Sequence, residues 1–367
     1  MPFRSSNIVR MLRPSVVVAL LYAAFLCLFS IIHGYSALDF VHLGTYWAQH
    51  KRPGTVGYDG QFYYQLARDP LGAQAFIDNV PYRYQRLVFP LVVRVLSLGQ
   101  VDLIPYMLLL VNFLSIVLSV EIVSRLLVKH GLSPWFSLAA GLYYGQTASL
   151  VFDTAEPFAY LLVCIGLLLL EKEHLTWAAL LMGLATLSRE TAILFPPGYA
   201  IFFLLRAQWK DAAQFIGLAI VPLAIEYALL WLIFGKTGIT YAPPFEHVPF
   251  AGVFFFSGDT DIWQRFLPLI FLLFIPTVSG WLLAAVEVVR RKWSPDLLIW
   301  LMNLLLVTFM ARLSYADLTS AGRLSTGLPL ALLLYGLTTR NSFILRASQI
   351  YTAMSPFYAV SILIFRV

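Results

Sequence analysis

The sequence predicts an all-α fold: a polytopic bundle of transmembrane helices that forms one integral-membrane domain over residues 1–367. The chain is 60% hydrophobic, above the about 45–50% of ordinary soluble domains, and its mean hydropathy is +0.78. Several apolar runs reach the roughly 20 residues that a helix needs to cross a bilayer. These runs lack the alternation of strands, and within lipid a helix satisfies its own backbone groups. We therefore expect a multi-pass protein whose first partner is the lipid bilayer.

The basic residues predict which side of the membrane each loop occupies. The net charge is +6, but Lys and Arg form short clusters between apolar runs, which is the positive-inside pattern and does not indicate a nucleic-acid partner. The chain is therefore expected in an inner or plasma membrane, with its N-terminus in the cytoplasm. The basic clusters are Arg4, Arg10 and Arg13; Arg125 and Lys129; Arg206 and Lys210; Arg290, Arg291 and Lys292; Arg340 and Arg346.

About eleven spans follow from this alternation. The first begins after Arg13 and is about 20 residues long, which exceeds the roughly 7–15 residues of a signal-peptide core, so we expect an uncleaved helix. The expected spans are residues 15–34, 103–124, 135–150, 157–170, 175–188, 191–206, 213–234, 265–288, 295–313, 324–338 and 349–365.

Two long extracytoplasmic loops are expected, residues 35–102 and 235–262. The first combines charged residues with many aromatic ones, which is atypical of a disordered segment. Within it we expect a short helix over residues 60–68 with Asp59 as its N-cap, and a second helix over residues 87–98. Both are expected to lie in the membrane interface and not to cross it.

Asp59 is the first candidate for catalysis. It lies in the stretch GYDGQFYYQLARDP, where Gly57 and Gly60 allow the backbone to approach a ligand closely. A capping carboxylate at a membrane surface can also face a cleft, so the capping and catalytic interpretations both remain open. Tyr63 and Tyr64 offer flat faces to a sugar or a lipid chain, and an aromatic belt at the interface is the alternative.

The stretch PYRYQR places two arginines on one side of a helical turn. Arg83 and Arg86 are three residues apart, and guanidinium groups donate paired hydrogen bonds that suit phosphate oxygens. Their alternative role is to reach lipid headgroups from the protein surface. Because they are expected on the outer side, they depart from the positive-inside trend and favour phosphate binding.

The stretch SRET places Arg189 and Glu190 between two apolar runs, with little room for a loop. Charged groups at such depth are functional candidates, and a mutual ion pair or pairing with Asp153 or Glu156 is the alternative. Asp153 and Glu156 could themselves hold a divalent cation such as Mg²⁺ or Mn²⁺ together with Asp59, or could cap the following helix. No other cofactor is expected.

Other polar residues carry weaker signals. Glu246 and His247 could form an acid–base pair in the second long loop, whereas Glu121 and Glu226 fall inside spans and are expected to be satisfied within the bundle. The remaining outer polar residues are expected to complete a rim: Asp259, Asp261, Arg265, Arg312, Asp317 and Arg323.

The acidic residues outside the basic clusters therefore converge on one side of the membrane. A transporter is expected to place polar residues at the midplane on broken helices, and a channel to place rings of charge along a pore. Neither pattern is evident. A polar cleft above an apolar bundle is typical of chemistry on a substrate carried by a lipid.

The stretches GYDGQFYYQLARDP, PYRYQRLVFP and SRET together resemble the GT-C superfamily of polytopic membrane glycosyltransferases, and loosely the bacterial relatives of PIG-V-type mannosyltransferases. The layout covers most of the chain, but the motifs cover only residues 57–90 and 188–191. The resemblance implies a catalytic acidic residue in the first outer loop and a polyprenyl-phosphate-linked sugar as donor. Many members carry two carboxylates in that loop, whereas Gly60 and Gln61 follow Asp59 here.

Carried onto this chain, the resemblance implies a role for each candidate. Asp59 is expected to accept the proton of an acceptor hydroxyl on a glycan, lipid or protein. Arg83 and Arg86, with Arg189 and Glu190 nearby, are expected to bind the donor and neutralise the departing phosphate, and a single displacement would invert the anomeric carbon. A lipid or glycolipid transporter or flippase, and a non-catalytic GT-C-like partner in surface-polymer assembly, are the alternatives.

Overall fold

The computed structural model describes residues 13–257 and 266–364, and the regular secondary structure of this part of the chain is helical. Its only strand-like pairing is an isolated bridge between Leu43 and Gly57, so within the described residues the predicted all-α class is confirmed.

Four helices are long and apolar enough to cross a membrane, which confirms a membrane protein but not the number of eleven spans. They agree with four of the expected runs. The first is Pro14–His33 (α2), and the second, Val101–Lys129, consists of η3 and α7 (Ile104–Lys129). The third, Trp209–Phe234, consists of α13 (Trp209–Ala219) and α14 (Val221–Phe234). The fourth, Leu267–Val289, consists of α16, a π-helical turn at Ile270–Phe274 and α17 (Ile275–Val289).

Several other apolar helices occur at expected positions but are shorter. They are α10 (Glu156–Leu170), α11 (Leu175–Ser188), Glu190–Leu205 (η5 and α12, Pro196–Leu205), α18 (Pro295–Phe309), α20 (Gly327–Thr338) and α22 (Ile350–Ile364). Two short helices, α19 (Leu318–Leu324) and α21 (Ser342–Ser348), connect the last of them.

The expected single span at 135–150 is wrong. The chain forms a 3-10 turn at Pro134–Ser137, then α8 (Leu138–Gly141), and turns at extended Tyr143 into α9 (Tyr144–Val151). The packing of α9 on α19 explains the bend, because a Cβ at Gly145 would lie 2.1 Å from the carbonyl oxygen of Gly322. Such close backbone contact holds α19 directly against α9.

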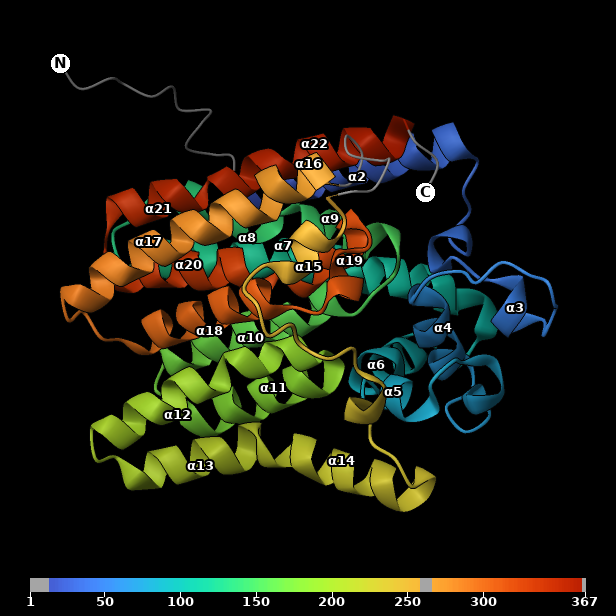
Figure 1. Ribbon diagram of the computed structural model, residues 1–367, viewed down its shortest axis with the longest axis horizontal. Helices are drawn as coiled ribbons and strands as arrows, with labels where there is room; N and C mark the ends of the chain where they lie inside the picture. The colour runs from blue at the N-terminus through green and yellow to red at the C-terminus, as the bar shows by residue number, and fades with distance from the viewer. Residues whose placement is uncertain (1–12, 258–265, 365–367) are drawn as a thin grey trace.

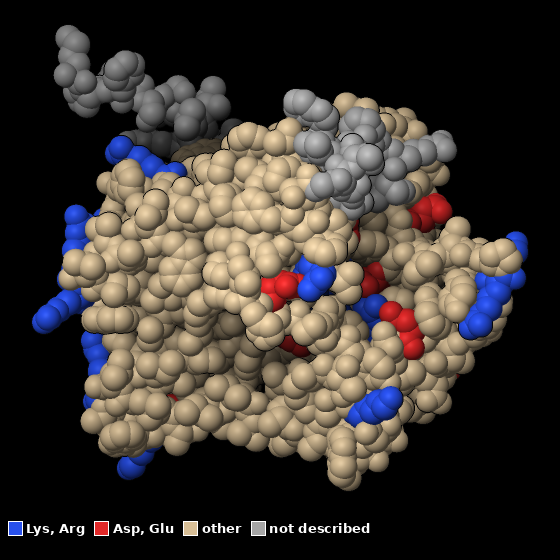
Figure 2. Space-filling model, in the orientation of Figure 1, with Lys and Arg blue, Asp and Glu red and all other residues tan. Residues whose placement is uncertain are grey.

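The helices run side by side along the bundle, with α10–α14 below α17–α22 in the view of Figure 1 and the helices of the first loop gathered at one end. Lys and Arg side chains border the opposite end, where α12 joins α13 and where α17 finishes (Figures 1 and 2). We call this the basic end, and the end that carries the first loop the loop end.

The first loop is compact and ordered. Its elements are η1 (Asp39–Val41), α3 (Thr45–Ala48), α4 (Gly60–Arg68), η2 (Ala73–Phe76), α5 (Val80–Tyr84) and α6 (Val88–Leu96). The helix expected at 60–68 is therefore confirmed, but its interfacial position is not, because residues 60–67 are all buried by other parts of the protein.

The second long loop is partly described. It contains η6 (Gly238–Tyr241) and α15 (Ala251–Phe255), whereas the rim candidates Asp259, Asp261 and Arg265 lie outside the described residues. Glu246 forms an ion pair with Arg312 (3.0 Å), and its backbone N–H donates to the carbonyl of Phe309 at the end of α18. The second loop is thereby attached to α18, and the expected Glu246–His247 acid–base pair gains no support.

Candidate active site

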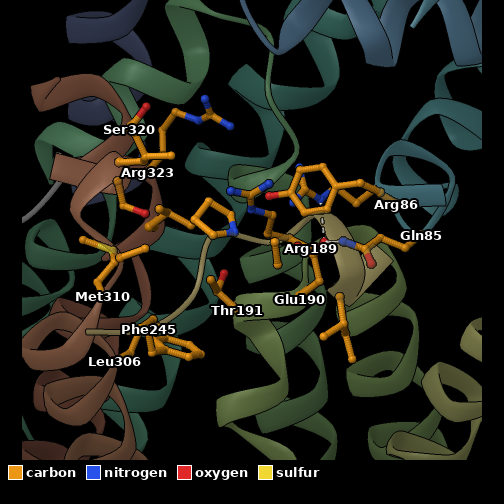
Figure 3. A pocket seen from close by; sticks show the side chains of 18 of the residues that line it. Gln85, Arg86, Arg189, Glu190, Thr191, Phe245, Leu306, Met310, Ser320 and Arg323 are labelled. Atoms are coloured by element: carbon orange, nitrogen blue, oxygen red, sulfur yellow. Dashed lines mark hydrogen bonds and ion pairs between the residues drawn. The ribbon is translucent and has the colours of Figure 1, made fainter. Parts of the chain in front are cut away.

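A cavity of about 460 Å³ lies between the first loop, the second loop and the ends of α11, α18 and α19. Its lining divides into a charged half and an apolar half (Figure 3). The charged and polar half includes Asp59, Tyr82, Gln85, Arg86, Arg189, Glu190, Ser320 and Arg323. The apolar half includes Ile239, Ala242, Pro243, Phe245, Leu306, Met310 and Leu313.

Asp59 lies at the start of α4 and contributes to the charged half. Its backbone is helical (φ −57°, ψ −29°) and its side chain makes no capping hydrogen bond, so the predicted N-cap role is wrong. The carboxylate instead accepts hydrogen bonds from Arg83 Nη1 on Oδ1 and from Arg323 Nη2 on Oδ2, each at 2.9 Å. Two strong ion pairs outweigh the single backbone hydrogen bond that a cap would supply.

The two glycines beside Asp59 have identifiable structural reasons. Gly57 has φ +73°, which favours glycine, and a Cβ at Gly60 would lie 2.3 Å from the carbonyl oxygen of Phe152. The start of α4 is thus pressed against the turn between α9 and α10. This contact holds the Asp59 carboxylate at the edge of the cavity.

Electrostatics keep Asp59 ionised. Burial alone would raise the pKa of its carboxyl, but the guanidinium groups of Arg83 and Arg323 outweigh burial and hold the pKa well below its usual range. The side chain is 28% exposed, so the carboxylate still reaches the cavity.

Arg323 joins the first loop to the bundle. Besides its bond to Asp59, it contacts Glu156 Oε1 through both Nε and Nη2, each at 3.1 Å, and its guanidinium lies over the ring of Tyr58. Glu156, at the start of α10, is fully buried and also lies 3.1 Å from Arg189 Nε. The predicted pairing of Arg189 with Glu156 is therefore confirmed.

Arg189 retains unused donors. It is 3% exposed, and among the described residues its Nε and Nη1 have no hydrogen-bond acceptor, because the contact of Nε with Glu156 lacks hydrogen-bond geometry. A buried guanidinium with free N–H groups beside a cavity is an unusual arrangement that an anionic ligand would explain. Figure 3 places Arg189 between Arg323 on one side and Arg86 on the other.

Arg86 and Glu190 form the other side of the charged half. Arg86 Nε donates to Glu190 Oε1 at 2.7 Å, and Gln85 Nε2 donates to the same oxygen. The Arg86 guanidinium lies 4.4 Å from the centre of the Tyr82 ring, which fixes its plane. Arg86, Arg189 and Glu190 thus meet as the sequence predicts, and they line the cavity together with Asp59.

Three of the predicted substrate contacts are placed elsewhere. Arg83 lies behind Asp59 and outside the cavity lining. Tyr63 and Tyr64 are 2% and 8% exposed and also lie outside the lining, with Tyr63 packed edge-on against Phe89. On α4 they follow Asp59 by four and five residues and face the protein core, so the geometry does not support a substrate contact for either tyrosine.

The predicted metal ligands do not fit a cation. Glu156 is occupied by two arginines, whereas Asp153 is fully buried in the turn before α10 with φ +46°. Burial raises the pKa of the Asp153 carboxyl well above its usual range, which disfavours the ionised form that a cation would need. Within residues 13–257 and 266–364 no group of three or more His, Cys, Asp or Glu side chains forms a potential metal site.

Sequence reasoning missed the importance of three residues. Arg323 was expected only in a polar rim, Gln85 was not singled out, and Asp78, which binds Arg83 at 2.6 Å, was one charge among many. Arg323 is 264 positions from Asp59 in the chain, so spacing carries no signal for this pair.

Comparison with protein-family models, with curated proteins and with solved structures found no match for this chain. The resemblance to GT-C glycosyltransferases therefore remains a prediction from the sequence motifs. The assignment of function rests on the geometry and chemistry of the cavity.

Proposed function

We propose that the protein is a membrane glycosyltransferase of GT-C type, which transfers a sugar from a polyprenyl-phosphate donor to an acceptor hydroxyl at the outer membrane surface. The observation that carries the proposal is the division of the cavity into two halves. Three guanidinium groups and two carboxylates line one half, and apolar side chains line the other. This pattern suits an amphiphilic phosphate, because the arginines can bind its polar group near the Asp59 carboxylate while the apolar half binds its lipid chain.

The phosphate is bound by Arg86, Arg189 and Arg323. Arg189 offers its Nη1 group, which has no acceptor among the described residues, and Arg323 faces the same space from α19. Guanidinium groups in a poorly hydrated cavity stabilise the charge that develops on a leaving phosphate. The lining carries three arginines against Asp59 and Glu190, and Glu156 outside the lining pairs with Arg189 and Arg323, so the case for a phosphate rests on the arrangement of N–H donors and not on net charge.

The chemistry is a single displacement. Asp59 accepts the proton of the acceptor hydroxyl while that oxygen forms a bond to the anomeric carbon. The bond from the anomeric carbon to the phosphate oxygen breaks, its electron pair stays on the phosphate, and the anomeric centre is inverted.

Binding of the donor prepares Asp59 for this role. Arg83 and Arg323 lower the pKa of Asp59 and weaken it as a base. The negative charge of a phosphate beside Arg323 offsets the guanidinium charge and raises the proton affinity of the carboxylate. Proton transfer therefore follows donor binding.

The apolar half receives the start of the polyprenyl chain. Ile239, Phe245 and Leu313 line the cavity and are each more than half exposed, so they also form an apolar rim. This rim offers an apolar exit for the chain beside the Glu246–Arg312 ion pair.

The proposed orientation follows from the charges. Basic side chains border the basic end, which we place in the cytoplasm with the N-terminus, and the cavity then faces the extracytoplasmic side of an inner or plasma membrane. We infer that the four long helices and the six shorter apolar helices described above cross the membrane, which is one span fewer than expected because residues 135–150 do not form a single helix. The product belongs to a cell-surface glycan or glycolipid.

The experiment uses purified protein in nanodiscs with a panel of polyprenyl-phosphate sugars. We expect donor-dependent release of polyprenyl phosphate in the wild type and a loss of about 100-fold or more in Asp59→Asn, because the general base is removed. The matched control is Asp102→Asn, an exposed aspartate at the end of the same loop, which should retain full turnover.

Three results would contradict the proposal. Retained turnover in Asp59→Asn would remove its catalytic role. Movement of the lipid across proteoliposomes without a new glycosidic bond would favour a transporter or flippase. Donor binding without turnover in the wild type, unchanged in Asp59→Asn, would favour a non-catalytic assembly partner.

A further inference from the structure

The guanidinium of Arg83 has all three nitrogens engaged. Nε donates to Asp78 Oδ1 at 2.6 Å, Nη2 donates to Asp78 Oδ2 at 2.7 Å, and Nη1 donates to Asp59 Oδ1 at 2.9 Å. The two bonds to Asp78 form the paired arrangement that is the strongest between guanidinium and carboxylate. Arg83 therefore has a fixed orientation and meets Asp59 through a single nitrogen.

The surroundings of Arg83 reinforce this orientation. Its guanidinium lies 4.0 Å from the centre of the Phe62 ring, and Asp78 Oδ1 also accepts the backbone N–H of Asn79 just before α5. Asp78 and Arg83 are five residues apart, so the pair is built locally within the first loop. Since Arg83 does not line the cavity, its role is toward Asp59 and not toward a ligand.

We propose that Asp78 is a positioning residue for the reaction: it holds Arg83 by two hydrogen bonds, so that the remaining nitrogen fixes one oxygen of Asp59 while Arg323 fixes the other. The proposal rests on the proposed function for Asp59 as the base. It assigns to Asp78, which does not line the cavity, an effect on turnover through Arg83.

The geometry indicates what happens without Asp78. A released Arg83 can turn its fork toward Asp59 and bind both carboxylate oxygens, in competition with Arg323. Its charge is then no longer balanced by Asp78, which lowers the proton affinity of Asp59 further. Both effects impair proton transfer and leave Arg86, Arg189 and Arg323 in place for the phosphate.

The first test compares Asp78→Asn with the control Asp102→Asn in the nanodisc assay. We expect kcat to fall about 10- to 100-fold, as is typical for residues that orient a reactive group, with KM for the donor changed less than about threefold. The acid limb of the pH–rate profile should move to lower pH. A rise in KM with unchanged kcat, or an unshifted pH profile, would overturn the proposal.

Two further variants address Arg83. Arg83→Lys keeps the positive charge but lacks the paired N–H donors of a guanidinium, so it should show the same loss in kcat as Asp78→Asn. Full turnover in Arg83→Lys would overturn the proposed positioning of Arg83 by Asp78. The double variant Asp78→Asn/Arg83→Gln should be no slower than the slower single variant, because both residues act through one contact. Losses that multiply would show independent roles.

A measurement without turnover separates this inference from the proposed function. Apparent Tm values of Asp78→Asn, Asp59→Asn and the double variant form a double-mutant cycle. If Asp78 positions Arg83 toward Asp59, the Tm shift of the double variant should differ from the sum of the two single shifts. If the wild type transfers no sugar, the proposed function fails and with it the role of Asp78 in turnover. Non-additive Tm shifts would still support the coupling of Asp78 to Asp59 through Arg83. Additive shifts overturn it in either case.

Discussion

The two ends of the molecule use the same kind of ion pair in different surroundings. At the loop end Arg323 and Asp59 lie 2.9 Å apart, and the arginine side chain is 2% exposed. At the basic end Arg125 and Glu121 lie 2.8 Å apart, but the arginine side chain is 65% exposed. Distance alone therefore does not distinguish the two.

Burial determines what each pair can do. Exposed ion pairs contribute about 0–1 kcal/mol, whereas removing one partner of a buried pair typically costs about 3–5 kcal/mol. The exposed pairs near Glu121 and Glu171 are consistent with residues that set orientation in the membrane. The buried network at the cavity is maintained against a desolvation penalty, which makes it the candidate functional site.

Removing Arg323 should give the largest difference between the two ends. Arg323→Ala leaves Glu156 fully buried with one arginine instead of two and leaves Asp59 with Arg83 alone. We expect a loss of about 3–5 kcal/mol in the free energy of unfolding and no measurable transfer. Arg125→Ala should change stability by less than about 1 kcal/mol. Thermal unfolding in nanodiscs measures both, and equal shifts would contradict the assignment of function to burial.

Arg189→Gln tests the free donors of the cavity. The variant keeps most of the bulk but removes the charge, so we expect the Kd for a polyprenyl phosphate to rise about 10- to 100-fold, from about 1.5–3 kcal/mol of lost charged hydrogen bonds. Arg206→Gln, near the basic end, is the control and should bind like the wild type. Unchanged binding in Arg189→Gln would place the phosphate elsewhere.

Substitutions at two glycines test whether the loop end is more tightly packed than the exposed helix α13. Gly60→Ala at the loop end places a Cβ 2.3 Å from a backbone oxygen and should destabilise by about 1–3 kcal/mol while displacing Asp59. Gly217→Ala on exposed α13 meets nothing within 4 Å and should stabilise by about 0.5–1 kcal/mol. Opposite signs of the Tm shift are expected, and a harmless Gly60→Ala would contradict the close approach.

The smallest effect is expected from pH. The pKa of Asp59 is lowered in the fold, so its contribution to stability is complete above the unfolded pKa of about 3.9 and declines as pH falls below it. Between pH 5 and 8 this group should leave Tm unchanged. Below about pH 4 the wild type should lose Tm more steeply than Asp59→Asn, and parallel curves for the two proteins would show that Asp59 carries no such linkage.

Several elements could be predicted because they depend on local sequence. The long apolar helices follow from hydropathy, and α4 begins and ends where its sequence signals predict. Arg86, Arg189 and Glu190 could be suggested as neighbours because charged groups in an apolar chain need partners. The roles of Arg83 and Tyr63 could not be predicted, because the direction of a side chain on α4 or α5 depends on what packs against that helix.

By itself, the sequence determined that the protein is helical and membrane-bound, and that charge near Asp59 and SRET is unusual, because hydropathy and charge act over a few neighbouring residues. Only the tertiary structure decided that Asp59 binds Arg83 and the distant Arg323 and not a backbone N–H. That pairing requires α19 to pack on α9 through Gly145 and Gly322, which brings together residues 264 positions apart. Such contacts depend on how whole helices pack against one another, and this packing cannot be predicted from a local sequence pattern.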